Sequence, residues 1–330
     1  MTTITGINTA VTTTGAREDL SDTITRISPE ETPLYTNALK AKAGAINHEW
    51  QTDTLDNGTI NSQLEGDTVA TSSASQTTRL GNILQISRRA YGVSRTVRQL
   101  NLAGRSDELI RLRMKKGLEL RRDMEVVLHT NQAKTVATGD TTARKLAGLP
   151  AWITAVTGSS DAAGPTTADG SSAATGPASS TATAVTYEQI SSAMQIAYTA
   201  GGNISLIELP PSLKRKFSLL AFGSAPSTAQ IRYNVDSAGQ AIAVGAVEKW
   251  QSDFGLCDII VNRQLKNTAA TFLNQAIFML EPEKIAVAQL TAFQTEKLAK
   301  TGDGDQEFIV SEYTLEMRAP SSHAAVYGVT

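Results

Sequence analysis

The longest regular pattern of apolar positions in the chain runs from residue 107 to residue 131 and predicts a helix. Apolar residues recur there mostly every three or four positions, which places them on one side of a helix; they are Ile110, Met114, Leu118, Leu120, Met124, Val127 and Leu128. Ser106 suits the N-cap, and Asp107 and Glu108 suit the positive end of the helix dipole. About 25 residues at 1.5 Å per residue make a rod of roughly 37 Å, which suits a structural spine.

A period of two replaces the helical period between residues 46 and 100. Strand-like alternation occurs at 46–53, 80–86 and 91–94. The stretch from Asp56 to Thr78 between the first two strands is polar and has almost no large apolar residue. The pattern therefore predicts a long hairpin that projects from the body. Because an isolated hairpin is marginally stable, we expect a partner subunit to order it.

The N-terminal residues 1–45 are predicted to form an extended arm. They are rich in Thr and carry no charge before Arg17. Ser28, with Pro29 and Glu31 behind it, fits a capping box, and Thr32-Pro33 repeats the arrangement of a capping residue followed by Pro. We expect two short helices here, ending by about Lys42.

Helical and strand-like segments alternate in the second half of the chain, which predicts an α/β or α+β body. Helices are expected from Tyr187 to about Ala200, before Gly201-Gly202, and from Pro211. Strands are expected at 204–209, 249–250, 257–261, 276–280 and 307–317, with 324–329 returning as the partner of 307–317. The small side chains of 221–246 suit a point where copies of the chain converge.

Residues 154–184 form a low-complexity insert of small side chains without an aromatic residue. Such a composition cannot bury a core of its own. We expect an exposed insert, which is either a flexible linker or a loop that decorates a surface.

The charge balance argues against tightly held nucleic acid. Lys and Arg total 30 against 32 Asp and Glu, a formal net charge of -2, whereas binding by counterion release needs a basic surplus. Cys257 is the only cysteine, so no intrachain disulfide forms and a reducing compartment fits. Neither a secretory signal nor an apolar stretch of about 18 residues is visible, so we expect a protein made in the cytosol, without a membrane span.

No motif predicts a catalytic, cofactor-binding or metal site. The histidines His48, His129 and His323 lie in three different elements without metal-ligand spacing. The acidic run 302–307 lacks the twelve-residue calcium-loop pattern and is interpreted as an exposed turn. Cys257 lies in an apolar strand, which favours an inert thiol, and phosphate-loop and nucleophile-elbow motifs are missing from the sequence. This indicates contact with other proteins rather than catalysis.

The basic residues of the long helix leave two interpretations open. They could contact a genome, or they could pair with interleaved acids of the same helix, as in Glu119 with Arg122 and Arg121 with Glu125. The second is the simpler interpretation.

Several short motifs occur in an order that resembles a known family. They are Arg17-Glu18-Asp19-Leu20, Ile27 to Leu34, His48 to Leu55, Glu65-Gly66-Asp67, Asn82 to Ile86, Val93-Ser94-Arg95-Thr96, Arg122-Asp123-Met124-Glu125 and Val310 to Met317. The chain thereby resembles the tailed-bacteriophage major capsid proteins with the Hong Kong 97-type fold, an α+β fold. The resemblance covers about residue 15 to the end, and the insert departs from the family pattern.

The resemblance implies a division of the chain into named parts. They are an N-terminal arm (1–45), an extended E-loop hairpin (46–100), a peripheral or P domain with the spine helix (101–153), the exposed insert (154–184), an axial or A domain (185–280) and a return to the P domain through C-terminal strands (281–330). The residues of the shared motifs that we expect at assembly contacts are Arg17, Asp19, Trp50, Asp53, Glu65, Asp67, Asn82, Gln85, Arg95, Arg122, Glu125 and Tyr313.

The function implied by the resemblance is self-assembly into pentamers and hexamers of an icosahedral or prolate shell around double-stranded DNA. Expected partners are other copies, together with portal, scaffold or decoration proteins, with DNA held weakly and no membrane. The location would be the virion capsid, after assembly in the bacterial cytoplasm. Some relatives cross-link through an E-loop lysine, but no Lys occurs between Lys42 and Lys115.

Two alternatives remain from the sequence. One keeps the fold and makes the chain the shell of an encapsulin-like cellular compartment. The other is a Thr/Ser-rich phage tail or surface-binding protein.

Overall fold

The computed structural model describes residues 24–68, 76–139, 141–176, 182–222, 232–235, 241–244, 247–265, 272–300 and 302–330. Two sheets form the body: a four-stranded sheet of order β1-β12-β13-β4 and a six-stranded sheet of order β5-β14-β11-β6-β10-β9. Two two-stranded pairs, β2-β3 and β7-β8, lie apart from them. The expected α+β class is confirmed.

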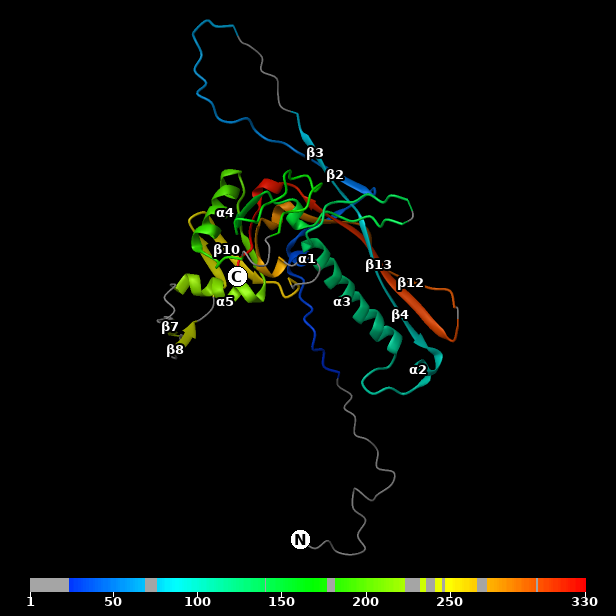
Figure 1. Ribbon diagram of the computed structural model, residues 1–330. Helices are drawn as coiled ribbons and strands as arrows, with labels where there is room; N and C mark the ends of the chain where they lie inside the picture. The colour runs from blue at the N-terminus through cyan, green and yellow to red at the C-terminus, as the bar shows by residue number, and fades with distance from the viewer. Residues whose placement is uncertain are drawn as a thin grey trace, which may run out of the picture.

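The four-stranded sheet is long and supports the longest described helix. Its strands are β1 (Leu39–Lys42), β12 (Ile285–Lys297), β13 (Gly304–Met317) and β4 (Gln85–Ser94). Helix α3 (Glu108–His129) crosses the sheet near β4 and β13 (Figure 1), and Leu120 packs against Tyr91 and Ile309. The spine helix is confirmed, although Asp107 rather than Ser106 is its N-cap, since the Asp107 carboxylate accepts a hydrogen bond from the backbone N–H of Leu109 at 2.8 Å.

The six-stranded sheet carries helices on one face and a shared core on the other. Its strands are β5 (Ala155–Gly158), β14 (Ala324–Tyr327), β11 (Ala276–Leu280), β6 (Leu206–Leu209), β10 (Gly255–Val261) and β9 (Lys249–Ser252). Helices α4 (Tyr187–Thr199) and α5 (Pro211–Phe222) pack on one face, where Met194 and Phe217 contact Ile207 and its neighbours. Leu206 and Phe278 point to the other face and join the core beneath Trp152, which also includes Val287 and Leu315 of the other sheet.

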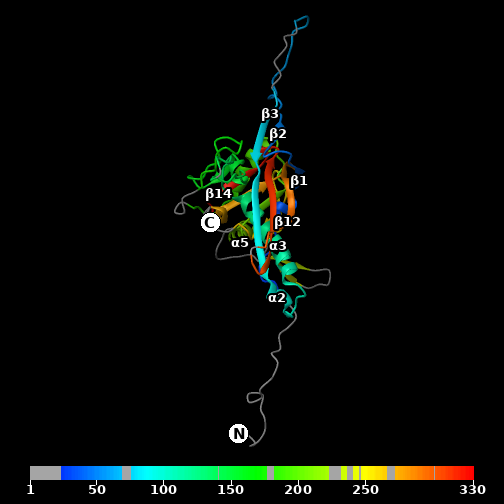
Figure 2. The same ribbon diagram turned by 90° about the vertical axis from the view of Figure 1, so that its right-hand side faces the viewer.

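The hairpin predicted from the alternating pattern is present. Strands β2 (Asn47–Thr52) and β3 (Thr78–Ile83) pair antiparallel, with Asn47 opposite Ile83 and Thr52 opposite Thr78. The chain between them, of which 53–68 and 76–77 are described, projects far from the body (Figures 1 and 2). Strand β4 and helix α2 (Arg95–Gln99), expected in the same hairpin, belong instead to the four-stranded sheet and its end.

The arm contains one short helix rather than two. Residues 28–32 are not helical, and α1 spans Pro33–Asn37. Pro33 explains the error, because the residue before a proline is driven out of helical geometry, so a helix started at Pro29 has no room to complete turns. The segment expected to stay helical up to Lys42 is β1, which pairs parallel with β12.

Two further expectations need correction. The segment 154–184 is not wholly exposed: β5 pairs with β14, and Ala155 and Ala174 are buried. A small-residue segment can complete a core that other segments supply. Strand β14 is not the partner of β13 but lies between β11 and β5 in the other sheet. The short 3₁₀ turns are Leu149–Ala151, Leu273–Gln275, Pro282–Lys284 and Pro320–Ser322.

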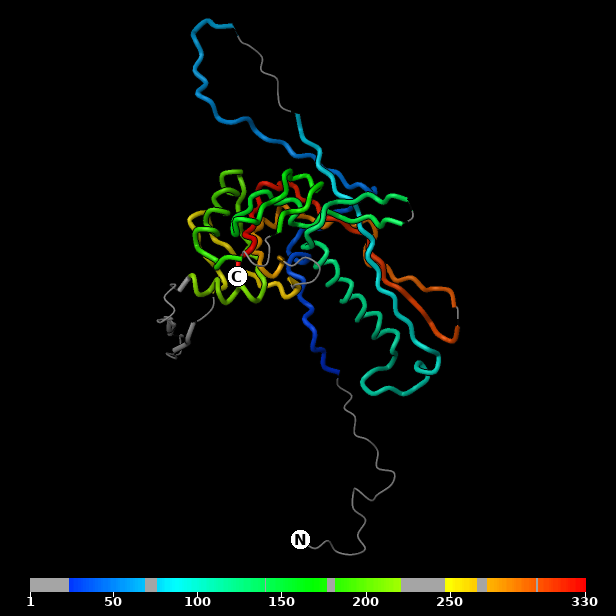
Figure 3. The backbone as a smooth tube through the Cα atoms, in the orientation of Figure 1, coloured from blue at the N-terminus to red at the C-terminus, as the bar shows by residue number. Residues whose placement is uncertain are grey.

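Some predictions fall outside the described residues. Arg17 and Asp19 are among them. In the expected convergence segment 221–246, only the backbone of the end of α5 and of the antiparallel pair β7 (Arg232–Val235) and β8 (Ala241–Val244) is described. Figure 3 follows the course of the backbone through the two sheets and the projecting hairpin. Among the described residues, no helix has the length and apolar character needed to cross a membrane.

Candidate functional site: assembly contacts and a buried polar junction

The loop 53–68 at the tip of the hairpin exposes both acidic and apolar side chains. Leu55, Ile60 and Leu64 are 97%, 99% and 80% exposed. Asp53 and Asp67, two of the expected contact residues, each accept a hydrogen bond from the backbone N–H of the next residue, at 2.9 and 2.8 Å. Glu65 lies between them in the same exposed loop. These side chains are free to meet another molecule.

The base of the hairpin is anchored to the chain's own body. The Trp50 indole lies 5.4 Å from the ring of Trp152, centroid to centroid, and its Nε1–H donates to the carbonyl oxygen of Met317 at 2.9 Å. His48 Nε2 lies 3.0 Å from Glu316 Oε2. Trp50 therefore fixes the direction in which the loop projects, which is a different role from the contact expected of it.

Of three further expected contact residues, two are buried within the subunit and one is partly buried. Asn82 Nδ2 donates to the carbonyl oxygens of Ala147 and Leu315 at 3.2 and 2.8 Å. Tyr313 is 0% exposed, its hydroxyl lies 3.1 Å from Ser87 Oγ, and burial raises its pKa. Partly buried Gln85 accepts a hydrogen bond from the backbone N–H of Leu146 at 3.3 Å. The expectation of direct intersubunit contact is corrected for Asn82 and Tyr313, which hold β3 and β13 in place.

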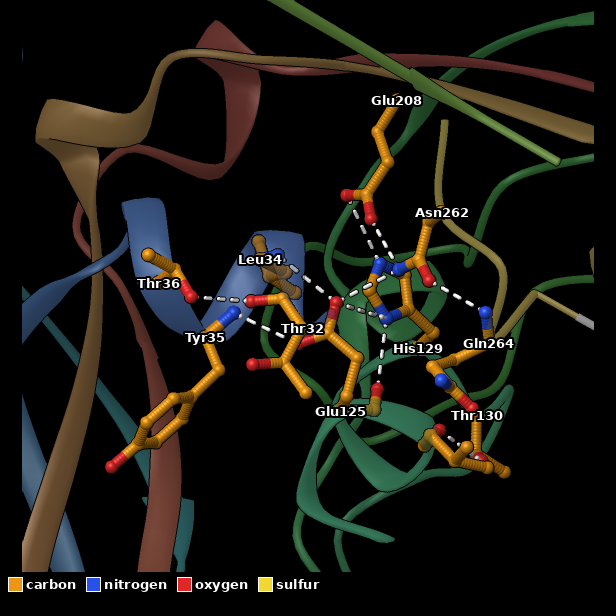
Figure 4. Close-up of polar contacts among 11 residues, drawn as sticks. Thr32, Leu34, Tyr35, Thr36, Glu125, His129, Thr130, Glu208, Asn262 and Gln264 are labelled. Atoms are coloured by element: carbon orange, nitrogen blue, oxygen red, sulfur yellow. Dashed lines mark hydrogen bonds and ion pairs between the residues drawn. The ribbon is translucent and has the colours of Figure 1, made fainter. Parts of the chain in front are cut away.

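Glu125, also expected at an assembly contact, is 0% exposed and lies at a buried polar junction (Figure 4). Its carboxylate accepts hydrogen bonds from the backbone N–H groups of Leu34 and Tyr35, both at 2.9 Å. These are the first-turn donors of α1, which are left without partners inside a helix. Thr32, the N-cap of α1, makes no side-chain cap hydrogen bond. The spine helix thus supplies the missing cap of the arm helix.

His129 and Glu208 complete the junction. His129 Nδ1 lies 2.9 Å from the carbonyl oxygen of Glu125, one turn earlier, and Nε2 lies 3.1 Å from Glu208 Oε2 of β6. Because both nitrogens face oxygen atoms, the imidazole is best satisfied when it carries both protons. Burial alone would lower the pKa of His129, but the carboxylates of Glu208 and Glu125 raise it to about 9.

Asn262, which follows β10, joins the two carboxylates. Its amide nitrogen donates to Glu125 Oε1 at 2.8 Å and also to Glu208 Oε1. Its own Oδ1 accepts from the backbone N–H of Gln264 at 2.7 Å, which fixes the orientation of the amide. The junction therefore ties the arm, the spine helix and the six-stranded sheet together.

Little in the sequence pointed to this junction. Glu125 and His129 are four residues apart on one helix, but Glu208 and Asn262 come from distant segments. In the sequence, His129 stands out only as a lone histidine late in the predicted helix, without metal-ligand spacing. Glu125, His129 and Glu208 have potential ligand atoms within 4.8 Å of one another and could hold a metal ion, although every one of these groups already has a hydrogen-bonding partner in the protein.

Charged residues of α3 pair both within the helix and with other elements. Glu119 pairs with Lys116 at 2.6 Å rather than with Arg122, and Arg121 donates to Thr36 Oγ1 at 2.8 Å rather than to Glu125. The two expected pairs are therefore wrong, although pairing within the helix does occur, in Arg111–Glu108 at 2.5 Å and in Lys116–Glu119. Two pairs fasten the helix to the sheet: Arg89–Asp123 at 2.5 Å and Arg113–Glu307 at 2.7 Å.

The acidic run 302–307, interpreted from the sequence as an exposed turn, is mostly strand: only Gly302 and Asp303 precede β13, which begins at Gly304, and Glu307 is buried. Asp305 pairs with Arg98 and Lys300, whose hydrogen bonds lower its pKa. Arg95, an expected contact residue, pairs with Asp303 at 3.1 Å on the surface. The acidic groups of the turn are thus matched by cations of the chain itself.

The profile of one protein family, the SU10 major capsid protein, matches residues 3–330. The chain belongs to the SU10 major capsid protein family. This is a family of structural capsid proteins, not of enzymes, and the membership confirms the prediction of a tailed-phage major capsid protein. It sets aside the alternative of a phage tail or surface-binding protein.

A curated relative and the solved structures agree with this assignment. The major capsid protein of Escherichia phage Phieco32 is 31% identical over 127 residues, which cover 38% of this chain and 36% of that protein. The chain thus matches only about a third of that relative's length.

Likeness among solved structures extends over nearly the whole chain. The capsid of a native GTA particle is 10% identical with a TM-score of 0.59, covering 97% of this chain and 98% of that one. A chain of Mycobacterium phage Bobi is 11% identical with a TM-score of 0.61 and covers 96% of each. At such identities the likeness concerns the fold, and the Hong Kong 97-type fold is confirmed.

Proposed function

We propose that copies of this major capsid protein assemble into pentamers and hexamers that close an icosahedral or prolate shell around double-stranded phage DNA. The observation that carries the proposal is the loop 53–68, whose Leu55, Ile60 and Leu64 are almost fully exposed at the end of a long projection. An isolated subunit gains nothing from such a loop, whereas an assembled one can bury it.

The energy available from this loop is substantial. Burying one Leu or Ile side chain contributes about 1.5–3 kcal/mol, so three contribute roughly 5–9 kcal/mol per contact before the cost of ordering the loop. Since a projection that docks on a different surface of the next copy makes a head-to-tail contact, repetition by rotation closes a ring. Each subunit of a ring then gives one loop contact and receives one.

The parts of the chain take their roles from this arrangement. We assign the arm to 1–45, the E-loop hairpin to 46–100, the P domain to 101–153 with 281–330, and the A domain to 185–280, with 154–184 as an insertion. Charged side chains of α3 are held in ion pairs with other residues of the chain, and the net charge of the chain is -2. Both observations support a shell wall that binds DNA weakly. The absence of Lys between Lys42 and Lys115 supports E-loop contacts without a lysine bond.

Further partners follow from the same proposal. Portal, scaffold and decoration proteins would act on the shell, and assembly would take place in the bacterial cytoplasm before the protein is found in the virion capsid. A neighbourhood of terminase and portal genes would separate this proposal from an encapsulin-like compartment, which would lack both.

The test is electron microscopy of the full chain expressed alone and with its neighbouring genes. We expect capsomers or closed shells, and we expect Leu55→Ser/Ile60→Ser/Leu64→Ser to abolish them. A matched variant of the same loop, Thr54→Ser/Asn61→Ser/Gln63→Ser, should assemble normally.

The melting temperature of the unassembled apolar-loop variant should stay within about 1 °C of that of unassembled wild type, because exposed side chains contribute little to folding. Monomers alone from the wild type under every condition, or normal shells from the apolar-loop variant, would contradict the proposal.

A further inference from the structure

The first half of α3 concentrates positive charge in a chain that is almost neutral. Residues 105–122, which run from just before α3 into its second half, contain seven Lys and Arg against three Asp and Glu. This surplus of four positive charges contrasts with the net charge of -2 of the whole chain, so the other residues together carry -6. The near-neutral total therefore conceals a basic segment.

Ion pairs within the subunit neutralise part of this segment. Arg113 pairs with Glu307 of β13 at 2.7 Å, and Lys116 pairs with Glu119 at 2.6 Å. These two cations have one carboxylate each. They fasten α3 to the sheet and to itself, and we assign them no further partner.

The remaining cations of the segment outnumber the acids that are left. Arg105 and Arg111 share one carboxylate, that of Glu108, at 3.1 and 2.5 Å. Asp107 pairs with Arg98, which lies outside the segment. Among the described residues, three cations of the segment form no ion pair at all: Lys115, Arg121 and Arg122.

Lys115 and Arg122 lie on the side of α3 that faces away from the core. At 3.6 residues per turn they are about 20° apart around the helix, roughly opposite the buried Leu120 and Met124. Arg111 is on the same side, and the helix rises about 16 Å from Arg111 to Arg122. Figure 1 shows β4 and β13 on the other side of α3. These three cations form a basic row along the spine helix.

Arg121 and Lys40 of β1 lie beside the basic row, towards the arm. Both approach the ring of Tyr35: the Arg121 guanidinium carbon is 5.1 Å and Lys40 Nζ is 3.6 Å from its centroid. Burial and the charge of Arg121 lower the pKa of Lys40 to about 8, against an opposing effect of Glu125. The two cations therefore repel each other, and an anion beside both would relieve the repulsion.

A row of cations without matching acids suits a partner with closely spaced negative charges. A DNA duplex carries one phosphate charge per about 1.7 Å of its axis, so 16 Å of helix lies along roughly ten phosphates. The few available cations of one subunit neutralise only a few of them, which gives weak binding per copy. Many copies in one shell would repeat the contact.

We propose that the basic row of Arg111, Lys115 and Arg122, with Arg121 and Lys40 beside it, contacts the phosphate backbone of the enclosed double-stranded DNA. This rests on the proposed function and gives its weak DNA contact a defined surface. The face of α3 that points away from the four-stranded sheet then lines the inside of the shell. The contact reads charge and not base sequence, because these side chains meet phosphates alone.

The first test measures DNA binding by the unassembled full chain, using fluorescence anisotropy of a short labelled duplex between about 20 and 200 mM salt. Lys115→Gln/Arg122→Gln should reduce the slope of log Kd against log salt by about 1.8 and weaken binding at least tenfold at about 50 mM salt. Arg215→Gln/Lys216→Gln is the matched control. It removes the same charge from two exposed positions of α5 and should leave binding unchanged.

A second variant guards against misfolding. Arg122 is partly buried, whereas Lys115 is exposed. If the double variant does not fold, Lys115→Glu compared with Lys216→Glu makes the same measurement at two exposed positions. Wild-type affinity in the α3 variant, or an equal loss in the α5 control, would overturn the proposal. So would an α3 variant that binds DNA normally but no longer assembles, since its cations would then meet an acidic protein surface.

The second test uses wild-type particles and needs no substitution. Lysine acetylation followed by mass spectrometry compares particles filled with DNA and particles emptied of it. Lys115 should react several times more slowly in the filled particles, while Lys216 should react equally in both. Equal rates at Lys115 would overturn the DNA contact and leave the shell function intact. A wild-type chain that never assembles would overturn the shell function, and the duplex measurement would still decide the DNA contact.

Discussion

Replacing Glu125 by glutamine tests whether the spine helix caps the arm helix with an ionised carboxylate. The two Glu125 oxygens accept hydrogen bonds from the backbone N–H groups of Leu34 and Tyr35 and from the Asn262 amide. In the Glu125→Gln variant the side chain offers one oxygen and an NH₂ group in the same space. The new NH₂ group would take the place of an oxygen that now accepts a hydrogen bond from one of these donors. At least one buried N–H group would therefore lose its hydrogen-bond acceptor.

The magnitude can be worked from these contacts. An unsatisfied buried donor costs about 1–3 kcal/mol, and each hydrogen bond that loses its ionic partner weakens by roughly 1 kcal/mol. Relief of the repulsion between Glu125 and Glu208 offsets part of this loss. We expect a net loss of about 2–4 kcal/mol in the free energy of unfolding. With an unfolding entropy of about 2.1 cal/mol/K per residue, the 330-residue chain should melt about 3–6 °C lower.

The assay is thermal unfolding of the unassembled subunit together with amide hydrogen exchange of the segment 30–40. Exchange there should accelerate more than in β13, because the arm helix loses its cap. Glu119→Gln is the matched control on the same helix: its pair with Lys116 is partly exposed and contributes at most about 1 kcal/mol.

Burial and the Glu208 carboxylate raise the pKa of Glu125. A protonated Glu125 is therefore the state that would contradict the capping argument. An unchanged melting temperature with unchanged exchange would mean that Glu125 already carries a proton in the folded chain. The capping argument would then be refuted.

Three further predictions concern the body of the subunit. The pKa of His129 is raised from 6.5 to about 9, so its contribution, about 3 kcal/mol at most, is complete below pH 6.5 and is lost as pH rises to 9; unfolding measured from pH 6 to 10 should show this decline, and His129→Gln should flatten it. Arg113→Met should lower the free energy of unfolding by about 2 kcal/mol in a denaturant titration, since Glu307 is 1% exposed but Arg113 is partly exposed; a loss below about 0.5 kcal/mol would contradict the anchoring role. Gly148→Ala should yield little folded protein in an expression assay, because a Cβ atom there would lie 1.9 Å from the carbonyl oxygen of Thr130; normal yield and melting temperature would count against this packing.

Local sequence patterns correctly predicted the elements whose secondary structure depends on a few neighbouring residues. The spine helix, the hairpin strands β2 and β3, and the helices α4 and α5 were found because period and capping residues act over a few positions. The same local rules predicted a helix starting at Ser28. Pro33 prevents this helix, because it lies only four residues after Pro29. The motifs of the family resemblance assigned Asn82 and Tyr313 to assembly contacts, because a motif does not show which face of the structure its residues take.

By itself the sequence determined the class of the fold, the projecting hairpin with its polar connection, the near-neutral charge and the absence of an E-loop lysine. Each of these follows from composition or from the period of a single segment. Only the tertiary structure decided the rest. It placed Glu208 and Asn262 at the junction with His129 and Glu125, and it paired β14 with β11 rather than with β13. It also left half of the apolar stripe of α3 exposed. Those arrangements depend on contacts between segments far apart in the chain, which no local period encodes.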